Sequence, residues 1–200
     1  MRVMLGLTVG LLAAPLTGVT AQSVWGVSAE VGIVRYWGAS GPVPGSEAVA
    51  VRPYRPAVYA ARLDRRLSSL RLAIGVRLAQ PGIAGEFEGG TTVVDDGFTL
   101  LELAPEGAIR VVRLGSSASV RIFGGPTVSF WALSDEPTRT RLGGRAGVEL
   151  ESQLTARLSA VTRVFGGISG SAFSAEEIPP GYEVRSMPSA GVSLGLRVGL

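Results

Sequence analysis

Large apolar residues alternate with small or charged residues along most of the chain. In the clearest stretch, residues 69–80, one set of alternate positions is aliphatic: Leu70, Leu72, Ile74, Val76 and Leu78. The positions between them carry small or cationic side chains: Arg71, Ala73, Gly75, Arg77 and Ala79. Successive side chains of a β-strand point to opposite faces, so this period of two residues predicts a strand with one apolar face.

The same alternation defines eight segments, which we predict to be strands. They are 24–37, 54–65, 69–80, 98–113, 117–132, 139–151, 154–165 and 184–200. Pro105 and Gly107 interrupt the fourth segment, where we expect a β-bulge. The sequence Gly-Gly-Pro at 124–126 predicts a local kink in the fifth, because proline cannot donate a hydrogen bond to a neighbouring strand.

The connections between these segments alternate in length. Long, Gly- and Pro-containing connections cover 38–53, 81–97 and 166–183, and one of moderate length covers 133–138. Short turns lie between them, at 65–68, 114–117 and 152–153. One end of the molecule is therefore expected to carry long loops and the other end only turns.

In the last segment the alternation continues to the final residue. Its apolar positions are Val192, Leu194, Leu196, Val198 and Leu200. Arg197 stands on the opposite, small-residue face. A strand of this kind at the end of the chain is expected to pair with the first one, through residues 24–33, and so to close a barrel.

The composition indicates which kind of barrel this is. Hydrophobic residues make up 46% of the chain and charged residues 18%, against about 25% charged in an average soluble domain. One face of every segment is rich in Leu, Val and Ile, and the other carries Gly, Ser, Ala, Arg and Glu. In lipid only helices and closed barrels satisfy all backbone hydrogen bonds. We therefore predict an all-β, eight-stranded antiparallel up-and-down transmembrane β-barrel. The alternative is a soluble exported barrel or sandwich.

The first residues have the pattern of a cleavable secretory signal peptide. Arg2 precedes an apolar run over 3–15, and small residues at 19–21 suit a signal peptidase. We expect cleavage after Ala21, which makes 1–21 the signal peptide and 22–200 the barrel domain. An N-terminal membrane anchor is the alternative.

Aromatic residues gather near the long-loop ends of the predicted strands, as in the interfacial girdle of a membrane barrel. They are Tyr36, Trp37, Tyr54, Tyr59, Phe98, Phe130, Trp131 and Phe165. Trp25 is the main candidate for a second girdle at the turn end.

With these features the chain resembles the small bacterial outer-membrane β-barrel proteins. The resemblance covers the mature chain and rests on the strand pattern, not on a fingerprint motif. It implies short periplasmic turns, outer loops at the cell surface, and a terminal strand that the barrel-assembly machinery reads. In that family the last residue is usually aromatic, whereas here it is Leu200.

The polar faces of the segments would line the barrel. The expected lumenal charge network is Glu30, Arg62, Arg71, Arg77, Glu102, Arg110, Arg121, Arg145, Glu149, Glu151, Arg157, Arg163 and Arg197. One interpretation is an electrostatic plug of Arg–Glu pairs, because eight strands leave an interior that side chains nearly fill. The other is a narrow pore that favours anions, since Arg outnumbers Glu nine to four in this set. Glu102 is the expected partner of Arg71, Arg77 and Arg121.

The residue types narrow the chemistry further. The chain has no His and no Cys, and all 19 basic residues are Arg. Some members of the resembled family are lipid A deacylases, acyltransferases or proteases, whose mechanisms use His, so we expect no enzyme and no catalytic residues. The net charge is +3, but the arginines are scattered along the chain and not clustered, which argues against nucleic-acid binding. Acidic residues at 86–88 and 95–96 could hold Ca²⁺ weakly or be solvated loop charges.

Three functions remain open at this point. The first is a structural or surface-interaction protein integral to the outer membrane. The second is a small channel for anions or hydrophobic solutes, and the third is a soluble periplasmic ligand-binding barrel. We expect a monomer in the outer membrane, without cofactor or metal, whose partners are membrane lipid and the assembly machinery.

Overall fold

The computed structural model describes residues 24–37, 40–42, 50–54, 57–87, 90–94, 99–132, 137–174, 176 and 182–200. The predicted signal peptide and its cleavage site at Ala21 lie outside these residues. Within them no helix is long and apolar enough to cross a membrane.

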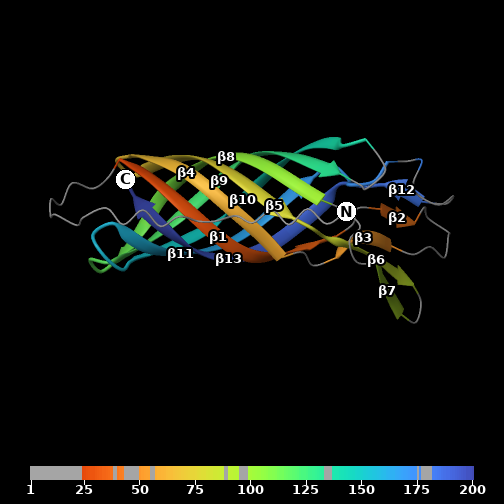
Figure 1. Ribbon diagram of the computed structural model, residues 1–200, viewed down its shortest axis with the longest axis horizontal. Helices are drawn as coiled ribbons and strands as arrows, with labels where there is room; N and C mark the ends of the chain where they lie inside the picture. The colour runs from red at the N-terminus through yellow and green to blue at the C-terminus, as the bar shows by residue number, and fades with distance from the viewer. Residues whose placement is uncertain are drawn as a thin grey trace, which may run out of the picture.

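Eight antiparallel strands form a closed barrel (Figure 1). They are β1 (Trp25–Tyr36), β4 (Ala57–Leu67), β5 (Leu70–Ala79), β8 (Thr99–Leu114), β9 (Ala118–Ala132), β10 (Arg139–Gln153), β11 (Leu158–Ser169) and β13 (Met187–Gly199). Each strand pairs with its neighbours in chain order, and β1 pairs with both β4 and β13. The predicted eight-stranded up-and-down barrel is confirmed.

The terminal strand closes the barrel as the alternation predicts. The β1–β13 register runs without a shift from Gly26 opposite Gly199 to Tyr36 opposite Ser189. Leu200 follows the strand, and its N–H donates a hydrogen bond to the carbonyl of Trp25 at 3.1 Å. Backbone pairing between the two ends of the barrel sheet therefore leaves no open edge at this seam.

The irregularities of β8 and β9 differ from expectation. The predicted bulge at Pro105 and Gly107 is wrong, because both residues stay in register with β5. The shift in the β8–β9 pairing lies instead between Arg110 and Val112. At Pro105 the neighbouring strand places Gly125, where a Cβ would collide with the Pro105 carbonyl. Glycine on β9 thus lets the two backbones approach where proline interrupts the pairing.

The seventh strand also begins later than its pattern predicts. Residues 154–157 form the turn after β10, and β11 starts at Leu158. Two hydrogen bonds fix this turn, from the N–H groups of Leu154 and Thr155 to the carbonyl of Leu158. Arg157 therefore belongs to the turn and not to the barrel wall.

Two small sheets extend the barrel at its long-loop end, where loops alone were expected (Figure 1). One pairs β2 (Ser40–Pro42) with β12 (Tyr182–Val184). The other has the order β3–β6–β7, with bounds Ala50–Tyr54, Gly82–Phe87 and Gly90–Val94. The sequence connections that were expected to be loops therefore build a structured extension beyond the membrane-spanning wall.

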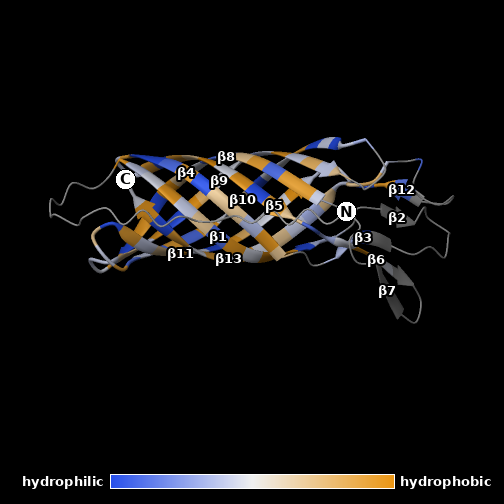
Figure 2. Cartoon of the chain, in the orientation of Figure 1, coloured by the Kyte–Doolittle hydropathy of each residue, from blue (hydrophilic) through white to orange (hydrophobic). Residues whose placement is uncertain are grey.

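The barrel is apolar outside and polar inside. Hydropathy colours alternate along the strands of the barrel wall (Figure 2). On β13 the exposed fractions are 58% for Leu194 and 51% for Leu196, whereas Arg197 is only 4% exposed. Burying large apolar residues drives the folding of a water-soluble barrel, so this inverted partition is that of a wall surrounded by hydrocarbon.

Candidate functional site: the barrel interior

The interior of the barrel holds most of the charged residues expected there. Ten members of the predicted lumenal set are buried: Glu30, Arg62, Arg71, Arg77, Glu102, Arg121, Glu149, Glu151, Arg163 and Arg197. The side chain of Arg145 is 7% exposed and joins them. Arg110 is half-buried at the turn end, and Arg157 is exposed in its turn. These last two make no ion pair with the other described residues, so they do not belong to the lumenal network.

Two further carboxylates, Asp64 and Glu106, belong to the network although the sequence pattern did not predict them. Asp64 is 2% exposed and Glu106 is 7% exposed. Asp64 shares the parity of Arg62 along its strand, a signal that was available in the alternation. Glu106 lies between Pro105 and Gly107. A β-bulge, as expected there, interrupts the alternation, so the sequence did not indicate which face carries Glu106. With both included, seven buried Arg face six buried carboxylates among the described lumenal residues.

The half of the lumen nearest the turns is built around Glu151 and Asp64. Arg197 donates two hydrogen bonds to Asp64, at 2.8 and 2.7 Å. Arg71 reaches Glu151 at 2.5 Å, and Arg121 bonds to the same carboxylate. The planar guanidinium fork suits such paired contacts, which is a physical reason for arginine at these positions.

The centre of the lumen is built around Glu149 and Glu106. Glu149 is 1% exposed and accepts hydrogen bonds from Arg71 at 2.7 Å and from Arg62 at 3.2 Å. Glu106 accepts from Arg145 at 2.5 Å and from Arg163 at 2.6 Å. Arg62 also pairs with Glu30. The carboxylates thus connect arginines from different strands into one continuous network across the barrel.

Of the three arginines expected to pair with Glu102, Arg77 does so and the other two do not. Arg77, the direct neighbour of Glu102 on β5, lies 3.3 Å away, and Arg145 bonds to Glu102 at 2.7 Å. Arg71 and Arg121 instead pair with Glu151. Arg71 stands six residues from Arg77 along β5, a separation of about 20 Å along the strand. Two residues on neighbouring strands can pair only if they also lie at the same height along those strands, and Arg71 does not lie at the height of Glu102.

Three aromatic residues of the predicted girdle lie inside the barrel and not at its outer surface. Tyr36, Trp131 and Phe165 are 4%, 2% and 5% exposed. The rings of Tyr36 and Trp131 meet edge to face with centroids 5.8 Å apart. The Arg77 guanidinium lies 4.4 Å from the centroid of Phe165. These rings fill the lumen on the loop side of the charge network.

A fourth lumenal aromatic, Phe123, was not anticipated. It is 2% exposed, and the Arg163 guanidinium lies over its ring at 3.5 Å from the centroid. Gly147 on the adjacent strand makes room for it, because a Cβ there would lie 2.8 Å from the Cζ of Phe123. Gly191 stands against Phe165 in the same way, at 2.6 Å. Small residues on the polar faces of the strands therefore make room for the large aromatic rings inside the barrel.

Little space remains between these side chains. The cavity among Glu30, Arg62 and Phe165 has a volume of about 20 Å³. The cavity beside Tyr36 and Glu102 has about 10 Å³. Each has room for about one water molecule. The described lumen is thus filled by ion pairs and aromatic rings.

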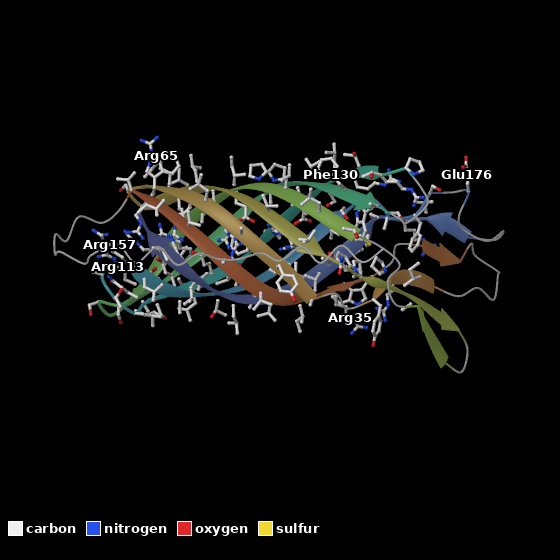
Figure 3. All side chains as sticks on the ribbon, in the orientation of Figure 1. Arg35, Arg65, Arg113, Phe130, Arg157 and Glu176 are labelled. Atoms are coloured by element: carbon white, nitrogen blue, oxygen red, sulfur yellow. The ribbon has the colours of Figure 1, made fainter. Side chains whose placement is uncertain are left out.

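The outer rim carries one Trp–Arg contact at each end. At the turn end Arg65 lies over the Trp25 ring, 5.4 Å from its centroid, and at the loop end Arg35 lies 5.3 Å from that of Trp37 (Figure 3). Twelve residues of strand separate the two tryptophans, about 40 Å along the strand and about 30 Å along the axis of a tilted barrel. This span matches a hydrocarbon core, and Trp and Arg suit its two boundaries.

The remaining predicted girdle members lie in several environments. Trp37 and Tyr59 are 37% and 61% exposed on the outer wall, while Tyr54 and Phe130 are half-buried. Phe98 lies outside the described residues. Trp25 is 45% exposed, as a residue of a turn-end girdle would be.

The described residues offer no group of three or more His, Cys, Asp or Glu that could hold a metal ion. The lumenal carboxylates are engaged by guanidinium groups. The acidic pair at 95–96, considered for Ca²⁺, lies outside the described residues.

Comparison with known proteins supports the fold. No protein-family model matches the sequence. No curated protein sequence matches it either. Among solved structures, neisserial surface protein A (NspA) is similar, with a TM-score of 0.58, 15% identity, and coverage of 89% of this chain and 98% of that one. A major outer membrane protein from Thermus thermophilus has a TM-score of 0.50 at 13% identity, covering 87% and 98% of the two chains. The predicted fold of a small outer-membrane β-barrel is confirmed.

Proposed function

We propose that the chain is an integral outer-membrane protein whose closed barrel anchors the loop-end sheets at the cell surface. One observation carries this proposal: the wall is apolar outside, while the interior is filled by paired charges. Such a body is suited to hold a structure in the membrane and not to pass solutes through it. Neisserial surface protein A, which has a similar fold, is by its name a surface protein.

The interior gives no support to the anion channel considered as an alternative. That idea depended on nine Arg against four Glu, whereas the buried lumenal set has seven Arg and six carboxylates. The voids of about 20 and 10 Å³ are too small for a hydrated ion to pass. A soluble barrel is disfavoured by the exposed aliphatic wall. We further propose a monomer without catalytic activity, with lipid and the assembly machinery as its partners.

Fractionation and epitope accessibility test this proposal together. We expect the protein in the outer-membrane fraction, migrating differently on SDS gels before and after boiling. A tag inserted after Glu176, exposed at the loop end (Figure 3), should bind antibody on intact cells. A matched tag after Ser116, exposed in a turn at the other end, should bind only after permeabilisation. Recovery in the soluble periplasm, or the reverse accessibility of the tags, would contradict the proposal.

A further inference from the structure

The largest of the cavities described lies at the turn-end mouth of the barrel, next to the packed part of the lumen. Its volume is about 340 Å³, within the range of about 300–1,000 Å³ that is usual for small-ligand pockets. Residues of β4, β8, β9, β10, β11 and β13 line it, together with the turns that follow β8 and β10. It shares Arg121, Glu151 and Arg197 with the lumenal network but lies at the mouth of the barrel, whereas the voids described deeper in the interior are at most about 20 Å³.

Positive charge dominates this cavity. Six arginines line it: Arg66, Arg110, Arg113, Arg121, Arg157 and Arg197. Glu151 is the one carboxylate among the lining residues, and it already accepts hydrogen bonds from Arg71 and Arg121. Arg197 is held by Asp64. The carboxylate of Glu151 is therefore already paired within the lumenal network. It does not neutralise the remaining arginines that line the cavity.

Three of these guanidinium groups have no ion pair with any described residue: Arg110, Arg113 and Arg157. Arg113 and Arg157 both lie at the turn end of the barrel (Figure 3), and they line the same cavity. They come from different connections, since Arg113 lies at the end of β8 and Arg157 precedes β11. The fold therefore brings together cations that are distant in sequence and leaves them without a counterion from the described residues.

The other polar groups in the cavity suit the same kind of ligand. Serine hydroxyls line it at 116, 117, 119 and 159. Ser119 accepts a hydrogen bond from Arg121 at 3.0 Å, so its own O–H is left to donate to another acceptor. Guanidinium forks and hydroxyl donors are the groups that recognise phosphate oxygens.

We propose that this basic cavity binds a phosphate-bearing anion. The ligand is either the phosphodiester headgroup of an anionic lipid at the turn-end membrane boundary or a free phosphate compound in solution. Both present the same oxygens to the same guanidinium groups. This binding activity goes beyond the anchoring role proposed above, and titration in detergent does not depend on which compartment the cavity faces.

Calorimetric titration of the folded full-length protein in detergent micelles tests the site. The probes are inorganic pyrophosphate and, separately, the soluble short-chain lipid dihexanoyl-phosphatidylglycerol. We expect saturable binding of at least one of them. Arg113→Gln and Arg157→Gln should each weaken it by roughly tenfold, because each removes a charge-assisted contact. Pyrophosphate binding alone assigns a free anion, and lipid binding alone assigns the headgroup.

The control is Arg65→Gln, which removes the same charge at the same end but from the outer wall beside Trp25. It should leave the affinity within about twofold of the unchanged protein, and a retained gel shift on boiling shows that each variant is folded. An equal loss of affinity in Arg65→Gln and Arg113→Gln would overturn the proposal in favour of diffuse surface charge. Absence of saturable binding for both probes would overturn it as well.

Discussion

Replacing Glu149 by Gln is expected to lower the free energy of unfolding by about 3–5 kcal/mol, the usual cost of removing one partner from a buried ion pair. Glu149 is 1% exposed and accepts hydrogen bonds from Arg71 and Arg62, with Arg163 3.4 Å away. The amide keeps the shape of the side chain but leaves these guanidinium groups short of one negative charge. Urea unfolding in lipid vesicles, followed by tryptophan fluorescence, measures the change.

The matched control is Glu183→Gln, which removes the same charge from an exposed pair. Glu183 bonds to Arg185 at 2.6 Å, and both side chains are about half exposed. Solvent screening makes such a pair worth about 0–1 kcal/mol, so this variant should unfold almost as the unchanged protein does. If Glu149→Gln also cost less than about 1 kcal/mol, the lumenal network would not be holding the barrel together.

Replacing Leu194 by Arg should cost about 2–4 kcal/mol in a bilayer, the range measured for cations at the midplane of membrane barrels. Leu194 is 58% exposed and sits midway along β13, opposite Val31 of β1. Its outward side chain would carry the new charge into hydrocarbon. The same vesicle unfolding assay measures the difference from the unchanged protein.

Leu154→Arg is the control that distinguishes a position facing lipid from one facing water. Leu154 is 57% exposed, almost the same as Leu194, but it lies in the turn after β10. A charge there stays in water and should change the stability by no more than about 0.5 kcal/mol. Equal, small effects for both variants would mean that the middle of the wall faces water, contrary to a membrane barrel.

The wall of the barrel was predictable because the alternation fixes which side chains share a face. Leu194 and Arg197 differ in parity along β13, and they lie on opposite sides as expected. The same parity could have placed the misassigned aromatics, since Tyr36 is in phase with Glu30, and Phe165 with Arg163. Position along the strand places a ring near the loop end, but only its parity determines whether it faces the membrane or the lumen.

Other features depend on information that the local pattern does not contain. The register of several strands across the lumen determines the partner of Arg71. Arg71 therefore pairs with Glu151 and not with Glu102. The strands β3, β6 and β7 are short and lie in Gly- and Pro-containing segments without a lasting alternation. The turn-end cavity arises from two separated turns and from the register shift near Val112, which places Arg113 at the rim.

The closed interior is tested most directly by single-channel recording of the unchanged protein in planar lipid bilayers. Folded protein should be verified in the same preparation by its gel shift on boiling. Because ion pairs and aromatic rings fill the described lumen, we predict no steady conductance steps above the bare bilayer. Reproducible, anion-selective steps from the folded protein would contradict a plugged barrel and favour a pore.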